Sequence, residues 1–224
     1  MIRIHRGLRK WIHLPKSQSS RMMSAAGKQC WKCSSHDVKN TFFCASCGVL
    51  RETSINDDYF KMLNLDKEFN IDGQKLTQNY RQIQSIIHPD KFSQKSEHEK
   101  AIALEWSSLI NKAYKTLSRS IDRGKYLLAL NGISISEENS SVDKEFLLKM
   151  MDVNESVEEA QTMDELKSIG SDVSIEIEEL NSKLTELFHI NDMNGAKEVI
   201  IRLKYVINID STIKEKMLHL KLNS

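Results

Sequence analysis

The sequence predicts an all-α protein. Only two prolines and eight glycines occur among the 224 residues, which leaves long stretches without helix-breaking residues. Apolar residues recur at intervals of three and four through most of the chain, which is the spacing of one face of a helix. With 40% hydrophobic and 28% charged residues, the chain has enough apolar material for a core. No window approaches the roughly 18 apolar residues of a membrane span, so we expect no membrane helix.

The N-terminal segment has the composition of a mitochondrial transit peptide. Residues 1–36 contain no acid but eight of the chain's 32 Lys and Arg residues, so the remainder carries 24 basic and 31 acidic side chains, a net charge of −7. An acid-free, Arg-rich and Ser-containing terminus is typical of mitochondrial import. The run from Arg21 to Ser24 resembles an import-protease site with cleavage after Met23. We therefore predict a presequence over residues 1–23 and a mitochondrial matrix location. A basic nucleic-acid-binding arm and an additional cytoplasmic pool stay open as alternatives.

Four cysteines follow as two Cys-x-x-Cys pairs, Cys30 with Cys33 and Cys44 with Cys47, ten residues apart. Two such tight turns supply four thiolates, which can close a tetrahedral shell around Zn²⁺. Four cysteines are too few for a disulfide scaffold in a chain of this length, and the βαβ context of a thioredoxin-like redox motif is missing. Because four thiolates leave no open coordination position, we predict one structural Zn²⁺ per chain in a zinc-knuckle segment over residues 24–55. Iron would fit the same ligands.

Three helices are expected between residues 56 and 120. Asn56 can cap a short first helix. The second helix begins at Asp72-Gly73 and ends before Pro89, because proline disfavours the helical conformation in the residue before it. A polar loop over residues 92–97 then leads to the third helix. The apolar faces comprise Tyr59, Phe60 and Leu63 in the first helix, Leu76, Tyr80, Ile83 and Ile87 in the second, and Ile102, Trp106, Leu109, Ala113 and Leu117 in the third.

The last part of the chain changes to long helices with few interruptions. Thr162 and Glu165 form a capping box. The apolar residues behind it keep an alternating spacing of three and four, which suits either a coiled-coil dimer or one wall of a bundle. These residues are Leu166, Ile169, Val173, Ile177, Leu180, Leu184 and Leu187, and the stripe of a partner helix comprises Ala196, Val199, Leu203 and Val206. Because the partner helix lies in the same chain, we predict an antiparallel three-helix bundle, with a homodimer left open.

The tripeptide His88-Pro89-Asp90 lies between two helices that are able to pack antiparallel, and Lys91 follows it. With the sequence from Leu109 to Tyr114 beyond it, the segment over about residues 56–120 resembles the J domain of J-protein co-chaperones. The alternative is that Pro89 only ends a helix. The resemblance implies a helical hairpin that docks on the ATPase domain of a DnaK-type heat-shock chaperone and stimulates ATP hydrolysis. The residues that it implicates in chaperone binding are His88, Pro89, Asp90, Arg81, Lys75 and Lys91.

A helix expected over residues 142–159 carries two apolar stripes. Acids accompany the second stripe, which argues against its full burial and indicates a face reserved for a partner. Tyr205 lies on the far side of the stripe in the last helix, and an exposed aromatic beside exposed Leu and Met is typical of a binding hot spot. The first stripe comprises Phe146, Met150, Val153 and Val157, the second comprises Leu148, Met151, Asp152 and Glu155, and Leu147 lies between them.

Together, the presequence, the paired Cys-x-x-Cys turns, the J domain and the acidic helical tail resemble the HscB family of mitochondrial iron–sulfur co-chaperones. The most specific segments are His88-Pro89-Asp90, the run from Arg123 to Leu128, and Phe146-Leu147-Leu148 with Met151. The resemblance implies a J domain over residues 56–134 and a scaffold-binding domain over residues 135–224. It further implies an iron–sulfur scaffold partner, and recipients with Leu-Tyr-Arg motifs as further partners. The scaffold contacts map onto Leu147, Leu148, Met151, Asp152, Glu155 and Tyr205.

Other functions fit the sequence less well. A general J-protein for protein folding is the main alternative, but no Gly/Phe-rich linker or large client-binding β domain follows the J domain. A zinc-ribbon nucleic-acid binder is disfavoured by the charge of −7 after residue 36, because phosphate contacts need concentrated Lys and Arg. We expect no membrane partner. We also expect no enzymatic activity, because His88 has no nucleophile or paired base nearby in sequence.

Overall fold

The computed structural model describes residues 29–36, 42–53, 58–135 and 143–222. Within these ranges no strand forms beyond a single bridge between Phe43 and Leu50, so the predicted all-α class is confirmed. None of the described helices is long and apolar enough to cross a membrane. The elements in chain order are α1 (Tyr59–Met62), α2 (Gly73–Ile87), the 3-10 helix η1 (Pro89–Phe92), α3 (Glu97–Ser118), α4 (Ser120–Leu130), α5 (Lys144–Glu159), α6 (Met163–His189) and α7 (Met193–Leu222).

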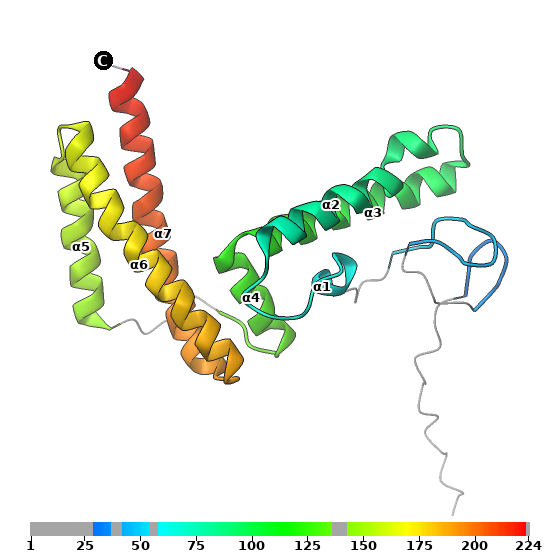
Figure 1. Ribbon diagram of the computed structural model, residues 1–224, viewed down its shortest axis with the longest axis horizontal. Coiled ribbons are helices and arrows are strands. Elements are labelled where there is room, and N and C mark those ends of the chain that lie inside the picture. Colours follow the sequence, from blue (N-terminus) through cyan, green and yellow to red (C-terminus); the bar gives the residue numbers. More distant parts are fainter. Residues whose placement is uncertain (1–28, 37–41, 54–57, 136–142, 223–224) are drawn as a thin grey trace, which may run out of the picture.

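Figure 1 shows two arms, with α4 at the joint between them. We call residues 58–135, from α1 to α4, the hairpin arm, because its longest part is the pair formed by α2 and α3. We call residues 143–222, from α5 to α7, the bundle arm. The described parts of residues 29–53, here called the knuckle segment, lie beside the hairpin arm (Figure 1).

Side-chain caps explain where the helices of the hairpin arm begin. The Asp72 carboxylate accepts hydrogen bonds from backbone N–H groups in the first turn of α2, and that helix ends at Ile87, as predicted. In α1 the capping residue is Asp58, whose carboxylate accepts a hydrogen bond from the N–H of Phe60. The predicted cap, Asn56, lies outside the described residues.

Helices α2 and α3 run antiparallel, as side-chain hydrogen bonds between Tyr80 and Asn111 and between Gln84 and Ser107 show. Two details of the core differ from the sequence prediction. Phe92, predicted in a polar loop, is buried because η1 turns its ring into the core. In α3, Ile110 is fully buried although the predicted stripe omits it, whereas Leu109, which the stripe includes, is half-buried.

The bundle arm matches the predicted three-helix bundle. Thr162 and Glu165 form the predicted capping box at the start of α6. The heptad-like stripe of α6 packs along α7 in the same chain, where Leu166, Val173 and Leu184 are buried. The bundle therefore buries this stripe without a second copy of the chain.

The two arms share one core at the joint. On α4, a Cβ placed on Gly124 would lie 2.8 Å from Cδ1 of Ile200 on α7, so the side chain of Ile200 packs against the bare backbone at this glycine. The ring of Phe69 stacks on that of Phe188 with centroids 5.2 Å apart. The guanidinium of Arg123 also lies over the ring of Phe69, 4.9 Å from its centroid, and donates a hydrogen bond to the backbone oxygen of Phe69 at 2.7 Å. These contacts hold the arms in one arrangement.

Candidate functional site

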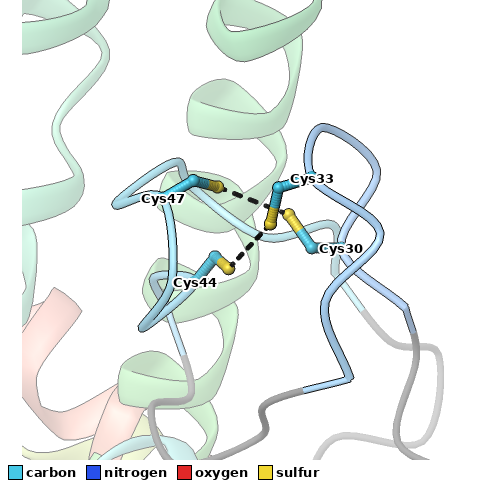
Figure 2. Close-up of side chains that lie close together, drawn as sticks. All are labelled: Cys30, Cys33, Cys44 and Cys47. Carbon is cyan, nitrogen blue, oxygen red and sulfur yellow. Dashed lines mark hydrogen bonds between the residues drawn. The ribbon is translucent and has the colours of Figure 1, made fainter.

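The four cysteines of the knuckle segment converge on one point (Figure 2). Their Sγ atoms all lie within 4.8 Å of one another. The Sγ atoms of Cys30 and Cys47 are 3.7 Å apart, and those of Cys33 and Cys44 are 3.6 Å apart. A tetrahedral shell with Zn–S distances of about 2.3 Å places neighbouring sulfurs about 3.8 Å apart. The arrangement of these thiols therefore fits one four-coordinate metal ion.

The two Cys-x-x-Cys turns have the same backbone geometry. The N–H of Ser34 donates to the carbonyl of Cys30 at 2.9 Å, and the N–H of Gly48 donates to the carbonyl of Cys44 at 2.8 Å. Ser34 and Gly48 have φ angles of 59° and 71°, in the left-handed region where glycine is favoured. This repeated turn brings both thiols of each pair to the same side.

The backbone of the turns also lowers the pKa of two of the thiols, those of Cys30 and Cys44. Backbone hydrogen bonds, that of Cys47 first, lower the pKa of Cys44 to about 6, although burial opposes them. Equivalent hydrogen bonds, that of Cys33 first, lower the pKa of Cys30. A backbone hydrogen bond from Val49 lowers the pKa of Cys47, but burial and the neighbouring thiols outweigh it and raise that pKa to about 12. The pKa values of these thiols diverge because neighbouring thiols interact with one another as well as with the backbone of the turns.

The knuckle segment is fastened to α3. The ring of Trp31 lies edge-on to that of His98, with centroids 4.5 Å apart, and Phe42 meets Trp106 in the same way at 5.0 Å. Leu50 is fully buried in the core of the hairpin arm. The knuckle segment therefore packs on the hairpin arm through Leu50 and its aromatic rings, while Cys30, Cys44 and Val49 form a small cluster of their own. The domain boundary at residue 55 stays a prediction.

The His-Pro-Asp turn is held rigidly and its charge is exposed. The N–H of His88 donates to the carbonyl of Gln84 at 3.0 Å and ends α2. Nδ1 of His88 lies 3.4 Å both from the backbone nitrogen and from Oδ2 of Asp90. Pro89 begins η1 and buried Phe92 ends it. The Asp90 carboxylate, 89% exposed, is thus presented at a fixed place on the surface.

The structure brings only some of the predicted basic residues near this turn. Lys91 is its direct neighbour in η1, and its side chain is exposed. Arg81 and Lys75 are exposed on α2, seven and thirteen residues before His88. At about 1.5 Å per residue, they lie roughly 10 Å and 20 Å from the turn along the helix axis. A chaperone surface that contacts Lys75 would therefore have to follow most of α2.

A groove runs between α5 and α7, where the sequence predicts the partner face. Leu148, Met151 and Tyr205 are 51%, 66% and 38% exposed, whereas Met150 is buried, so the two predicted stripes of α5 are confirmed as a buried and an exposed face. Asp152 is also exposed, but neither Asp152 nor Leu148 lines the groove. The residues that line the groove are Leu147, Met150, Met151, Asn154, Glu155, Glu158, Tyr205, Asn208, Ile209 and Thr212.

The groove extends beyond the predicted contacts. Four polar lining residues did not figure in the sequence prediction: Asn154, Glu158, Asn208 and Thr212. Asn208 and Thr212 follow Tyr205 by three and seven residues, which places all three side chains on one face of α7. Helical spacing from Tyr205 was therefore a signal that could have identified this half of the groove.

Comparison with known proteins gives consistent similarities. Residues 142–214 match a family model described as the HSCB C-terminal oligomerisation domain. The chain is 36% identical over 196 residues to the iron-sulfur cluster co-chaperone protein HscB of Homo sapiens, a match that covers 86% of this chain and 83% of the relative. It is 32% identical over 164 residues to the co-chaperone protein HscB homolog of Paraburkholderia phymatum, covering 71% and 94%. The crystal structure of the human co-chaperone protein HscB gives a TM-score of 0.80 at 36% identity, covering 84% of this chain and 98% of that one.

Proposed function

The chain belongs to the HscB family, and we propose that it is a co-chaperone in iron–sulfur cluster biogenesis. The bundle arm binds the cluster scaffold protein, while the hairpin arm, as a J domain, stimulates ATP hydrolysis by a mitochondrial DnaK-type heat-shock chaperone. Hydrolysis clamps the scaffold on the chaperone and promotes cluster transfer to recipient proteins. This division of roles between the arms is supported by two exposed residues, Asp90 in η1 of the hairpin arm and Met151 in α5 of the bundle arm. Figure 1 shows these two arms on either side of the joint.

The hairpin arm suits recognition of a charged partner. An exposed carboxylate fixed in a short helical turn can accept charge-assisted hydrogen bonds from an arginine of the chaperone. Lys91 beside it, and Arg81 further along α2, offer positive charge to an acidic groove on the same partner. The proposal assigns no catalysis to this chain, because the chaperone hydrolyses the ATP.

The bundle arm suits recognition of a folded partner through a small hot spot. Leu148, Met151 and Tyr205 offer large apolar surfaces without being needed for the core. Asp152 and Glu155 add negative charge at the rim, where charge complementarity favours a basic partner surface and correct orientation. Recipients with Leu-Tyr-Arg motifs are further candidate partners.

The knuckle segment has a structural role in this proposal. Cys30, Cys33, Cys44 and Cys47 would hold one Zn²⁺ in a closed shell, which supplies folding energy rather than reactivity. The N-terminal composition supports import into the mitochondrial matrix, where the heat-shock chaperone and the scaffold would be met.

Chaperone ATPase measurements test the proposal. Single-turnover hydrolysis by the mitochondrial chaperone would be followed with this protein, with the scaffold, and with both. We expect stimulation by this protein alone, and a greater effect with the scaffold present than the two separate effects combined. If an unfolded client replaced the scaffold equally well and the bundle arm did not bind the scaffold, a general J-protein would be the better description.

A further inference from the structure

Helix α5 forms one wall of the partner groove, yet few side chains hold it in place. Of its 16 residues, Phe146, Met150 and Val157 are buried, and Leu147, Val153 and Asn154 are half-buried. A helix with so narrow a buried face can tilt or slide on its neighbours unless other contacts restrain it. Lys149 joins α5 to Glu176 on α6 at 2.7 Å, so the width of the groove depends on this ion pair and on the contacts that join α5 to α7.

One such contact binds the C-terminal end of α5. Nζ of Lys216, on α7, donates hydrogen bonds to the backbone oxygens of Val157 at 2.8 Å and Glu158 at 2.5 Å. The last carbonyl groups of a helix have no partner within the helix. A cation at this end is also favoured by the helix dipole. One side chain of α7 thus satisfies two carbonyl groups that the sequence of α5 alone leaves without partners.

Lys216 also faces the start of α6. The pKa of Glu165, in the capping box, is held below its usual value first by the backbone N–H groups of Gln161 and Thr162 and, more weakly, by the charge of Lys216. The ammonium group therefore lies where the end of α5 and the beginning of α6 meet.

This contact lies at one end of the groove. On α7, Lys216 follows the lining residue Thr212 by four residues, one helical turn. On α5, Glu158 both lines the groove and accepts the hydrogen bond. The other end is closed by Phe146, whose ring lies against that of Tyr205, with centroids 6.2 Å apart, and 5.3 Å from the guanidinium of Arg202. Contacts between α5 and α7 thus bound the groove at both ends.

We infer that Lys216 is a positioning residue for scaffold binding: it fixes the spacing of α5 and α7 without contacting the partner. The inference rests on the proposed function, because it assumes that the scaffold binds in the groove between α5 and α7. Lys216 lies two residues beyond the stretch that matches the family model.

Three variants test it. Lys216→Met keeps the apolar stem but removes the donors and the charge, whereas Lys216→Arg keeps both. Lys214→Met removes the same charge from a side chain that is 71% exposed and pairs with Asp210 on its own helix. At a temperature where every variant is folded, calorimetry would give scaffold affinity, and amide hydrogen exchange would report the opening of α5.

We expect Lys216→Met to lose about tenfold in scaffold affinity, as for the loss of a charged hydrogen bond. Amide hydrogen exchange should accelerate in the second half of α5 but not in α2 or α3. This pattern would distinguish a local loosening of α5 from a general loss of stability. Lys216→Arg should restore most of the affinity, and Lys214→Met should behave as wild type.

Two results would overturn the inference alone: wild-type affinity in Lys216→Met, or unchanged exchange in α5. In either case the proposed function would stand, provided that truncation of the exposed groove residues still weakened binding. If the wild-type protein failed to bind the scaffold, the proposed function would be wrong and the inference would fall with it. Should Lys216→Met not fold, Lys216→Gln removes the charge and shortens the side chain while keeping it polar, and it should show the same losses in smaller measure.

Discussion

At the scale of single residues, solvent exposure distinguishes side chains that pack in the core from side chains that can bind another protein. Asp90 contacts His88 within the described chain, and its carboxylate is 89% exposed. Exposed ion pairs contribute little to stability. The charge of Asp90 is therefore better explained by recognition of another protein than by the fold.

We predict that Asp90→Asn abolishes stimulation of the chaperone ATPase. The substitution keeps the shape of the side chain but removes the charge that an arginine of the chaperone would bind. The melting temperature should change by no more than about 2 °C, and scaffold affinity should be unchanged. Single-turnover ATP hydrolysis, thermal unfolding and calorimetry measure the three quantities.

Glu97→Gln is the matched control, because Glu97 is 91% exposed near the same turn and pairs only with Lys100 on its own helix. It should leave stimulation intact. Full stimulation by Asp90→Asn would remove the basis for assigning a J domain.

At the scale of elements, adjacent residues of α5 have opposite roles. Both residues line the groove, but Met150 is 6% exposed and packs into the core, whereas Met151 is 66% exposed and stays accessible to a partner. The same contrast holds between Phe146, which is buried, and Leu148, which is not. A helix with these two faces contributes to stability with one and to binding with the other.

We predict that Leu148→Ala, Met151→Ala and Tyr205→Ala together lower scaffold affinity by about thirtyfold or more. The free energy of unfolding should change less than for a buried residue, because Leu148 and Met151 are at least half exposed and Tyr205 loses only its edge contact with Phe146. Chaperone stimulation without the scaffold should survive, since Asp90 lies on the other arm. Calorimetry and chemical denaturation measure affinity and stability.

Met150→Ala is the matched comparison on the same helix. Truncating this buried methionine should cost about 2–5 kcal/mol of stability. If the triple variant were destabilised as strongly, the three side chains would belong to the core. If it bound the scaffold normally, the partner site would lie elsewhere.

The knuckle segment is the second element with a testable chemistry. We predict one metal ion per chain, lost in the variant Cys30→Ser with Cys44→Ser, as measured by elemental analysis. Metal binds thiolates, and Cys47, with a pKa of about 12, carries a proton at neutral pH that binding must release. Metal affinity should therefore rise with pH and fall on acidification.

Metal removal should also disturb the hairpin arm. The ring of Trp106 is 1% exposed and is covered by Phe42, which follows the first cysteine pair and precedes the second. Loss of the metal should therefore change tryptophan fluorescence and lower the melting temperature of the hairpin arm. Metal-free protein with unchanged fluorescence and stability would show that the knuckle segment is independent, as the sequence-based domain boundary implies.

At the scale of the whole molecule, sequence patterns predicted the features whose cause lies within one element. The alternation of Met150 and Met151 follows from helical spacing, and the capping box at Thr162 follows from two residues three positions apart. The two Cys-x-x-Cys pairs likewise predicted a tetrahedral cluster from local turns. Each of these features needs information from only a few neighbouring residues.

The sequence analysis missed the contacts that join distant segments, because such contacts depend on residues far apart in the chain. Leu50 belongs to the core of the hairpin arm, and Lys216 binds carbonyl groups more than fifty residues before it. Phe92 has a polar neighbourhood in sequence but an apolar one in space. Single-sequence periodicity carries no information about which surfaces meet, so these contacts required the fold.

The joint between the arms allows a last prediction about the whole molecule. We predict that Gly124→Leu destabilises the protein, because a Cβ there would already lie 2.8 Å from Ile200 Cδ1 and 3.4 Å from the ring of Phe69. Overpacking costs about 1–3 kcal/mol, and the better helix propensity of Leu offsets less than about 1 kcal/mol of it.

Gly73→Leu is the control, since nothing lies within 4 Å of its Cβ position. Urea denaturation should show a lower midpoint for Gly124→Leu only. ATPase stimulation in the presence of the scaffold should fall further than stimulation without it, because an altered joint changes where the groove lies relative to Asp90. Equal stability of both variants, with equal stimulation, would show that the arms do not depend on this close approach.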